Sequence, residues 1–544
     1  MRRGLEFILI ICILLTVPIL SYAANTKPIA QFRFEKQSFQ ENEPIKAIDE
    51  SYSPSGNEIV KRQWKCIING KQKTSANLTG LLSNVKAGQI EVFLRVKDSS
   101  GSWSNWVSKK IKITKPIPLK ITHFKSEQSI YSVGEKLQLT YTYDNPNDLE
   151  IKGQRWRYRN LSTNGSVISS KPRYLKKPGL YEISLEIQDE WGNWSNKVTC
   201  KVNVSNKVIE RNGYYLFEKG KQGDLIDGYI DKDYNSFDAS NIISIQDIPG
   251  TLIMSNSPES IYSSGILYKD TTNGIGRLLV HHQNRTQYSK KLMILVSTPE
   301  SEPVTLKISN KAIAGPNKHI LQTGQNAVIQ YLKGSTAQNY TVKPGEMLCV
   351  YDSSTLKGWK SEEVVSGTLD FESTGQVIWQ IVAMDEKSSI ENVSMLKVLN
   401  RDVHNRGTFN VIERQYILDL TGITNPTKLV LGREQEEWLQ GIDVLTGDTM
   451  WNKGNYGLPI KIVIKNSEDM GVIANARGGN ILGALKWNQS KVFSIPSEDI
   501  LSSKTVAALV GTIKANTDNE IIYMLPNGSS APMLFGFIPK NQWK

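Results

Sequence analysis

Apolar and polar residues alternate along most of the chain from about residue 30 onward. Residues 92–113 (VFLRVKDSSGSWSNWVSKKIKI) contain two such runs, separated by Asp-x-x-Gly and then Trp-Ser-Asn. A period of two places successive side chains on opposite faces of a strand, while Asp and Gly are typical of the turn between strands. The pattern predicts a β-hairpin.

The same pattern returns about 91 residues later, in residues 183–204 (ISLEIQDEWGNWSNKVTCKVNV). The matched positions are Asp98 with Asp189, Gly101 with Gly192, Trp103 with Trp194, Asn105 with Asn196 and, upstream, Trp64 with Trp156. Units of this length with a tryptophan in a central strand are typical of β-sandwiches. The repeat predicts two sandwiches in tandem, over residues 27–114 and 119–204.

The turn sequences of these units carry a resemblance to a known family. The first unit has Tyr-Ser-Pro-Ser-Gly at residues 52–56, followed by Trp64 and the Val-x-Asp-x-x-Gly hairpin ending at Gly101. The second has Tyr-Asp-Asn-Pro at residues 143–146, followed by Trp156. The two units resemble PKD-type or related immunoglobulin-like repeats of bacterial exported proteins. This resemblance implies a sandwich fold and a role as spacers or adhesive modules.

From residue 214 the chain continues as short β-branched runs separated by Gly, Asn, Pro and Ser. One segment, residues 324–334 (GQNAVIQYLKG), instead places apolar residues on one helical face, and it is predicted to be a helix. The candidate strands outnumber those of one small sandwich, and the alternation is lost around residues 392–409. We therefore predict an all-β protein in which two jelly-roll-like β-sandwich domains, residues 214–400 and 401–544, follow the repeats.

Several runs in this C-terminal part carry a second resemblance, at residues 276–286, 404–409, 452–457, 476–488 and 524–532. They are similar to an uncharacterised extracellular region of surface proteins from Gram-positive bacteria. This resemblance implies location and architecture and carries no activity with it.

The amino terminus has the three parts of a secretory signal peptide. Arg2 and Arg3 precede an apolar run at residues 7–20, and Ser21-Tyr22-Ala23 supplies small residues for cleavage after Ala23. An uncleaved anchor remains the alternative. No second apolar stretch is long enough to span a membrane. Residues 1–23 are thus expected to direct the chain to an extracellular or cell-wall-associated location, without an integral span after cleavage.

Charge bears on the choice of partner. The chain has 65 Lys and Arg against 53 Asp and Glu, a formal charge of +12, which becomes +11 when cleavage removes two arginines and one glutamate. This net charge is expected to be spread over the chain, with basic groups such as Lys109-Lys110, residues 155–159 and Lys176-Lys177. A basic exported protein is attracted to anionic wall polymers or lipid head groups. Nucleic acid is not an expected partner, because the chain lacks a recognition helix and RNP-like aromatics.

The composition limits the chemistry. The chain has 5 His and 4 Cys, with no HxH, HxxxH or CxxC spacing, so no metal, cofactor or catalytic residue is assigned. The cysteines left after cleavage, Cys66, Cys200 and Cys349, are expected to be unpaired and buried. No Gly-x-Ser-x-Gly elbow or P-loop occurs. A non-enzymatic protein is therefore favoured, with a carbohydrate-active enzyme, a glycosidase or lyase bearing PKD-type accessory domains, as the alternative.

Polar and aromatic residues at strand ends and in loops are the candidates for ligand binding. Asn, Arg and His can hydrogen-bond sugar hydroxyls or carboxylates, and Trp or Tyr can stack on a sugar ring. Turn capping, core packing and pairing across the domain interface are the alternative explanation for the same residues, and the more common one for residues of these types. The candidates are His282, Asn284, Arg285, His404, Arg406, Trp451, Tyr456, Asn475 and Arg477. Together these features favour a secreted or cell-surface binding, adhesion or wall-associated protein, with a glycan or wall polymer as ligand.

Overall fold

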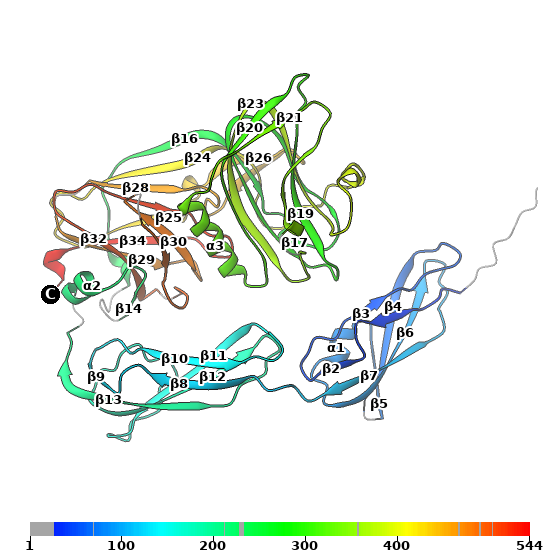
Figure 1. The fold of residues 1–544 in the computed structure, drawn as a ribbon, viewed down its shortest axis with the longest axis horizontal. Coiled ribbons are helices and arrows are strands. Elements are labelled where there is room, and N and C mark those ends of the chain that lie inside the picture. The colour runs from blue at the N-terminus through cyan, green and yellow to red at the C-terminus, as the bar shows by residue number, and fades with distance from the viewer. Residues whose placement is uncertain are drawn as a thin grey trace, which may run out of the picture. The chain divides into compact units, whose positions relative to one another are not determined.

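The computed structural model describes residues 27–68, 70–210, 213–227, 233–355, 358–465, 468–488, 491–502 and 504–543. The predicted signal peptide lies outside these residues. The chain forms two compact units, residues 1–209 and 210–544 (Figure 1). About 53% of the residues are in strands and 9% in helices, which confirms the predicted all-β class.

The first repeat is a sandwich of a two-stranded and a five-stranded sheet, in the orders β1-β3 and β2-β7-β6-β4-β5. Alternate residues of the central strands point into one core, where Trp64, Val92 and Leu94 are buried. The elements are β1 (Phe32–Phe34), β2 (Ser38–Gln40), β3 (Ala47–Asp49), β4 (Ile59–Ile68), β5 (Lys71–Ser75), α1 (Leu78–Leu82), β6 (Gly88–Asp98) and β7 (Val107–Thr114).

The second repeat has its own core, built around Trp156, Ile183 and Leu185. Its sheets have the orders β10-β8 and β11-β12-β13-β9. The predicted central tryptophans thus occupy equivalent core positions in both repeats. The elements are β8 (Lys120–Ser126), β9 (Ile130–Val133), β10 (Leu139–Asp144), β11 (Ile151–Asn160), β12 (Gly179–Asp189) and β13 (Val198–Val208).

Both repeats pair an early strand with their last strand in parallel. In the first repeat β2 lies parallel to β7, and in the second β9 lies parallel to β13. Among the described residues of the two repeats, the other strand pairs are antiparallel. The parallel pair therefore closes the larger sheet of each sandwich at one edge.

The second unit combines a 15-stranded sheet with a six-stranded sheet of order β14-β32-β29-β34-β25-β15. Its elements up to residue 395 are α2 (Gly213–Lys219), β14 (Leu225–Asp227), η1 (Tyr234–Ser236), β15 (Asp238–Ala239), β16 (Ile242–Ser255), β17 (Ser260–Ile261), β18 (Gly265–Asn284), β19 (Lys290–Ser297), β20 (Val304–Asn317), α3 (Ile320–Lys333), β21 (Gln338–Val342), β22 (Leu348–Asp352), η2 (Ser353–Thr355), β23 (Val364–Asp385) and η3 (Ile390–Met395). The remaining elements are β24 (Arg406–Asp419), β25 (Thr427–Leu431), η4 (Gln435–Glu437), β26 (Leu439–Asp443), β27 (Asp448–Asn452), β28 (Ile460–Lys465), β29 (Met470–Ala476), β30 (Gly483–Trp487), β31 (Lys491–Ile495), β32 (Val506–Ile513), β33 (Asn519–Tyr523), β34 (Met533–Pro539) and η5 (Lys540–Gln542).

Two hydrophobic cores organise this unit. In one, the two halves of the long strand β23 pair with different partners, β20 and then β19, and side chains from both halves enter the same core. The other core lies between the six-stranded sheet and strands β24, β28, β33 and β30 of the large sheet. Because β16 and β24 are neighbours in one sheet, pairing continues across residue 400. The domain boundary at that point stays a prediction.

The predicted helix is confirmed as α3. Ala327, Val328 and Leu332 are buried, and Tyr331 is half-buried beside them. None of the three cysteines predicted to be free forms a disulfide; Cys66 is buried, and Cys200 and Cys349 are half-buried. Burial raises the pKa of all three thiols to about 11, which makes them unreactive near neutral pH. Within the described residues, no helix is long and apolar enough to cross a bilayer.

Candidate functional site

A break in the large sheet produces an open cavity. Between Pro249 and Leu252 the pairing of β16 with β24 shifts register, because Gly250 and Thr251 on β16 stand against Asn410 alone on β24 and none of the three is paired between these strands. Proline has no amide hydrogen to donate to the ladder. Gly250 has φ 156°, and a Cβ there would lie 2.8 Å from the Ile412 side chain. The Pro-Gly pair therefore separates the two strands locally.

The cavity at this break has a volume of about 600 Å³. None of its lining residues carries a charge: they are Pro249, Gly250, Thr251, Thr408, Phe409, Asn410, Gln440, Gly441 and Ile442. Trp451 lies directly opposite Gln440 in the β26–β27 pair. Residues opposite each other in an antiparallel pair project to the same side of the sheet. The half-buried Trp451 therefore extends the wall that begins at Gln440.

This arrangement suits a small uncharged ligand with hydroxyl groups. Cavities of a few hundred to about 1,000 Å³ hold such ligands in many proteins, and a few polar groups fix their orientation. Amide side chains such as Asn410 and Gln440 both donate and accept hydrogen bonds. An indole such as that of Trp451 offers a flat apolar face beside them.

A second polar cluster surrounds Asp402, ahead of β24. Its carboxylate accepts hydrogen bonds from Ser257 Oγ (2.8 Å), the Glu259 amide (2.8 Å) and the His404 amide (2.9 Å). The His404 imidazole lies between two carboxylates, with Nδ1 3.0 Å from Asp402 Oδ1 and Nε2 3.1 Å from Glu259 Oε2. The cluster ties the loop after β16 to the loop before β24.

The surroundings shift the pKa values of the two carboxyl groups, Glu259 and Asp402, in opposite directions. Burial raises the pKa of Glu259. Burial also acts to raise the pKa of Asp402, but hydrogen bonds from His404 and Ser257 outweigh it and hold that pKa well below its usual range. The hydrogen bond to Asp402 raises the pKa of His404. The imidazolium form of His404 is thus stabilised between the two acids.

Two adjacent histidines of β18 lie beneath this cluster. His282 is fully buried, with Nε2 2.8 Å from Ser255 Oγ and Nδ1 2.8 Å from the Pro258 carbonyl. His281 is also buried, and its Nδ1 has no hydrogen-bond partner in the described structure. Burial lowers the pKa of His281 to about 3 and that of His282 to about 4, so both are neutral at pH 7. Within the described ranges, no group of three or more His, Cys, Asp or Glu is placed to hold a metal ion.

Three further candidates near this cluster form hydrogen bonds or ion pairs with other parts of the second unit. Arg406 is buried and donates to Asp443 through Nε (3.0 Å) and an Nη atom (2.9 Å), and also to two backbone carbonyls. The buried Asn284 amide donates to the Tyr288 and Trp359 carbonyls and so organises the turn after β18. Arg285 forms a surface ion pair with Glu362.

The remaining candidates lie elsewhere. Tyr456 packs between two cores and donates its hydroxyl to the Ser529 carbonyl (2.7 Å). Asn475 is buried at the end of β29, in the six-stranded sheet, where its amide donates to the Val506 carbonyl. Arg477 pairs with Asp233 at 2.6 Å. Of the nine candidates, Trp451 therefore borders the uncharged cavity, and five share the region around Asp402: His282, Asn284, Arg285, His404 and Arg406.

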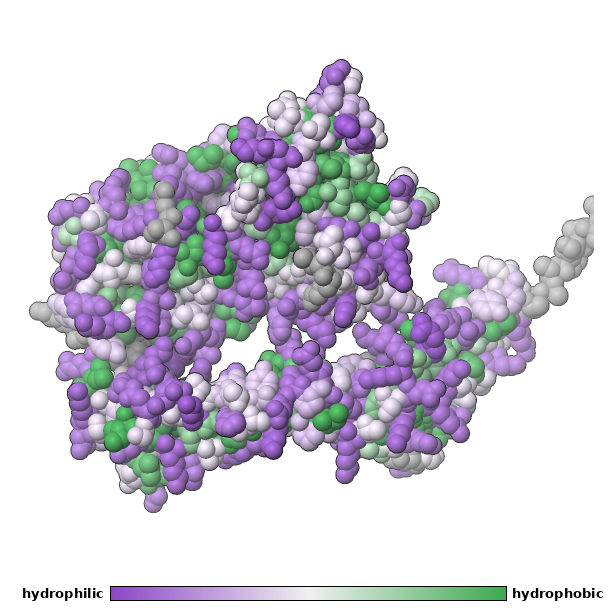
Figure 2. Space-filling model, viewed as in Figure 1, coloured by the Kyte–Doolittle hydropathy of each residue, from purple (hydrophilic) through white to green (hydrophobic). Residues whose placement is uncertain are grey.

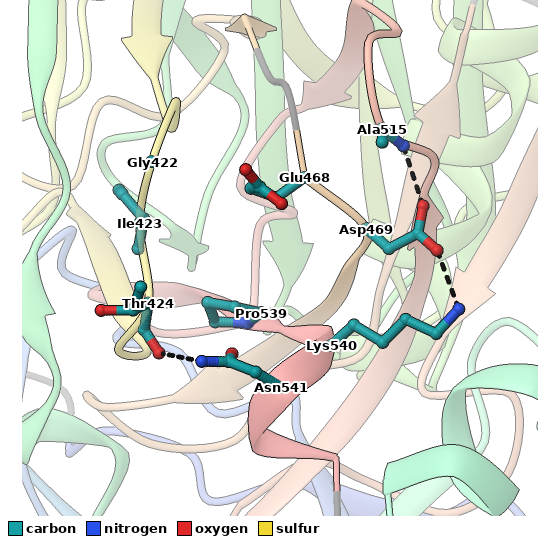
Figure 3. A pocket seen from close by; sticks show the side chains of 9 residues that line it. All are labelled: Gly422, Ile423, Thr424, Glu468, Asp469, Ala515, Pro539, Lys540 and Asn541. Atoms are coloured by element: carbon teal, nitrogen blue, oxygen red, sulfur yellow. Dashed lines mark hydrogen bonds and ion pairs between the residues drawn. The ribbon is translucent and has the colours of Figure 1, made fainter.

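Two other cavities contain none of the candidates. One, of about 500 Å³, lies beside the six-stranded sheet, where Asp469 accepts hydrogen bonds from the Ala515 amide and from Lys540 Nζ, both at 2.9 Å (Figure 3). Asn541 donates to the Thr424 carbonyl at its other side. The third cavity, between α3 and β23, is about 10 Å³, the size that holds one water molecule.

Three residues that line the uncharged cavity are not among the sequence-predicted candidates: Thr251, Asn410 and Gln440. Each lies in an ordinary alternating run and belongs to no polar cluster. The available signal was the Pro249-Gly250 pair inside a strand-like segment, since that pair is typical of a break in a sheet.

Comparisons with known proteins identify no family. No family model matches the chain, and no curated protein matches it. Among solved structures, fibronectin(III)-like modules of Clostridium thermocellum CbhA are 14% identical, with a TM-score of 0.16, over 33% of this chain and 97% of theirs. Carbohydrate-binding modules of the β-sandwich superfamily are 12% identical, with a TM-score of 0.14, over 50% of this chain and 99% of theirs. A bacterial ice-binding adhesin is 9% identical, with a TM-score of 0.20, over 64% of this chain and 98% of that chain. Likenesses this low assign no function.

Proposed function

We propose that this chain is an extracellular or cell-wall-associated binding protein without enzymatic activity. Its ligand is a neutral glycan held in the cavity between β16, β24 and β26. The uncharged lining beside Trp451 carries this proposal, because amide groups and an aromatic face match the hydroxyls and the C–H face of a sugar. The two immunoglobulin-like sandwiches serve as a stalk, and the predicted signal peptide exports the chain.

Binding of the full-length protein to an array of neutral glycans tests this proposal. Trp451→Ala is expected to weaken binding about tenfold, because it removes the stacking surface. Gln440→Ala is expected to have a smaller effect, because the exposed amide is partly replaced by water. Trp191→Ala, which changes a half-buried tryptophan in the other unit, is the matched control. Retained binding by Trp451→Ala would show that the cavity is not the glycan site.

The alternative, a carbohydrate-active enzyme, has one observation in its favour. Glu259 and Asp402 have pKa values moved in opposite directions, as in the acid and base of a glycosidase. However, the imidazole of His404 bridges the two carboxylates and so occupies the space that a glycosidic bond would need. Incubation of the protein with the same glycans is expected to release no reducing sugar. Hydrolysis that Glu259→Gln abolishes would establish the enzyme instead.

A further inference from the structure

The positive charge of the chain belongs to the first unit. Residues 27–209 carry 30 Lys and Arg against 17 Asp and Glu, whereas residues 210–544 carry 33 against 35. The expectation that the net positive charge is spread over the chain is therefore wrong, because the second unit is close to neutral. On the side shown in Figure 2, hydrophilic residues cover most of the tandem sandwiches, and apolar residues form only small separate patches.

Within the first repeat, many cations share one face of the five-stranded sheet. In β6, buried residues at even positions alternate with residues at odd positions that point away from the core. The cross-strand partners of these odd positions lie on the same outer face. Six cations project from it: Lys61, Lys65, Arg95, Lys97, Lys110 and Lys112. The acidic residue among these cross-strand positions is Glu91.

Aromatic rings alternate with these cations. Lys65 Nζ lies 4.1 Å from the ring centre of Phe93 and 4.8 Å from that of Trp106. The Arg95 guanidinium lies 4.6 Å from the ring centre of Trp103 and 4.8 Å from that of Trp106. Cation–π contacts of this kind hold long flexible side chains in place. The order across the face is therefore ring, cation, ring, cation, ring.

The six cations of this face have one acid among them, Glu91, and so leave a net positive charge. Arg95 Nε donates to the neutral Gln63 side chain at 2.7 Å, and Glu91 accepts a hydrogen bond from Ser108. Among the ion pairs of the described residues, none includes any of the six cations. Their charge is thus available to an external anion, at a face where half-buried rings already exclude part of the water.

We infer that the outer face of the β2-β7-β6-β4-β5 sheet binds an acidic polysaccharide. The lysines and Arg95 attract its carboxylates, and Phe93, Trp103 and Trp106 contact the apolar faces of its sugar rings. A broad sheet face suits an extended polymer, whereas the cavity of the second unit suits a small neutral ligand. The face lies in the other unit, so this inference does not depend on the neutral-glycan site.

The test uses the full-length protein and three soluble polymers: polygalacturonate, polyphosphate and dextran. Polygalacturonate offers both sugar rings and carboxylates, polyphosphate offers charge alone, and dextran offers sugar alone. The expected order of affinity is polygalacturonate, then polyphosphate, with dextran unbound by this face. Binding of polygalacturonate is expected to weaken as salt is raised, because ions screen exposed charges.

Lys65→Glu/Arg95→Glu is expected to weaken polygalacturonate binding by about tenfold or more. The double variant removes two cations and adds two carboxylates, which repel the carboxylates of the polymer. Lys120→Glu/Lys207→Glu makes the same change in net charge in the second repeat and is expected to have a much smaller effect. Trp106→Ala is expected to reduce binding of polygalacturonate more than that of polyphosphate.

Equal losses in the two double variants would overturn the inference, since net charge alone would then explain binding. Polyphosphate binding as tight as that of polygalacturonate would also overturn it, because the rings would have no part. Trp451→Ala is expected to leave polygalacturonate binding unchanged, so failure of this site and failure of the neutral-glycan site are distinguished. Melting curves of each variant confirm that the repeat stays folded.

Discussion

The two repeats of the first unit have the same core and hairpin framework but differ in the charges on the outer face of the larger sheet. In both, the hydroxyl of the serine after the turn tryptophan accepts a hydrogen bond at 3.0 Å from a strand amide, Val96 to Ser104 and Ile187 to Ser195. In both, the turn tryptophan forms an isolated bridge with the preceding strand. The hairpin framework is therefore the same, down to individual hydrogen bonds.

The outer sheet faces differ at one decisive position. Glu186 occupies the place in the second repeat that Arg95 has in the first, at the 91-residue offset. Glu186 pairs with both Arg155 and Arg157 at 3.4 Å, and Arg159 pairs with Glu182 at 2.9 Å. The arginines of the second repeat are thus matched by acids on the same face. Inward positions therefore fix the sandwich, while outward positions can either leave positive charge unpaired or pair it with acids.

The largest expected effect tests whether the two sandwiches are separate folding units. Leu94 and Leu185 occupy equivalent positions, and both are fully buried. Leu94→Ala and Leu185→Ala are each expected to lower the free energy of unfolding by about 2–5 kcal/mol, through lost burial and the cavity left behind. Calorimetry of the full chain should show that each variant shifts a different transition. A common shift in both variants would mean that the repeats unfold as one.

The next effect extends the comparison to the two units and concerns pH. The second unit buries two neutral histidines, His281 and His282, whereas residues 27–209 contain only His123. Because the folded-state pKa values, about 3 and about 4, lie below those of the unfolded chain, the unfolded state binds more protons. As pH falls from about 6.5 toward the folded-state pKa, each histidine should lower the free energy of unfolding by about 1.4 kcal/mol per pH unit. Urea unfolding at several pH values measures this slope, and His282→Gln should make it shallower.

A smaller effect is expected from a substitution that gives the second repeat the outer-face charge of the first. Glu186→Arg removes the partner of Arg155 and Arg157 and leaves Arg155 stacked on Trp194, with 3.9 Å from the guanidinium to the ring centre. The variant is expected to bind polygalacturonate several-fold more tightly than the wild type, by adding a second basic face. Glu190→Arg, with the same change in charge in the nearby turn, is the control. Equal gains in the two variants would argue against a role for the outer face.

The smallest effect concerns Asp98, the first residue of the turn that joins β6 to β7. Hydrogen bonds from Ser100 and the Ser102 amide lower the pKa of Asp98. A lowered folded-state pKa adds stability above the unfolded pKa, and this contribution is lost as pH falls through the folded pKa. Asp98→Asn should therefore unfold at lower temperature than wild type at pH 6, with the difference shrinking toward pH 2. A difference that does not vary with pH would exclude the charge of Asp98 as its source.

The parts predicted from sequence are those that depend on local pattern. Alternation and the repeat predicted the strands and the core tryptophans Trp64 and Trp156, and helical periodicity predicted α3. These features repeat within a few residues, so they can be read along the chain. The joining of β16 to β24 depends instead on a pairing between segments more than 140 residues apart.

Partners distant in sequence also explain why several candidate residues proved to have structural partners. In the sequence Arg406 and His404 are polar residues of one short segment, but their partners Asp443 and Glu259 lie 37 and 145 residues away. The sequence alone does not distinguish an arginine that is buried against an acid from one that is exposed to solvent. The outer face of the first repeat was passed over for the opposite reason: its cations lie singly in alternating strands, and only the sheet gathers them.

The parallel pairing of β2 with β7 and of β9 with β13 has a mechanical consequence. Once the first strand, β1 or β8, has been pulled out of its sheet, a pull on the two ends draws the second strand and the last strand in opposite directions along their common axis. The hydrogen bonds between them then bear the load in shear and must break together, whereas strands peeled apart at a hairpin would break one bond at a time. In each sandwich the parallel pair therefore resists a pull along the strands more strongly than a hairpin pair does.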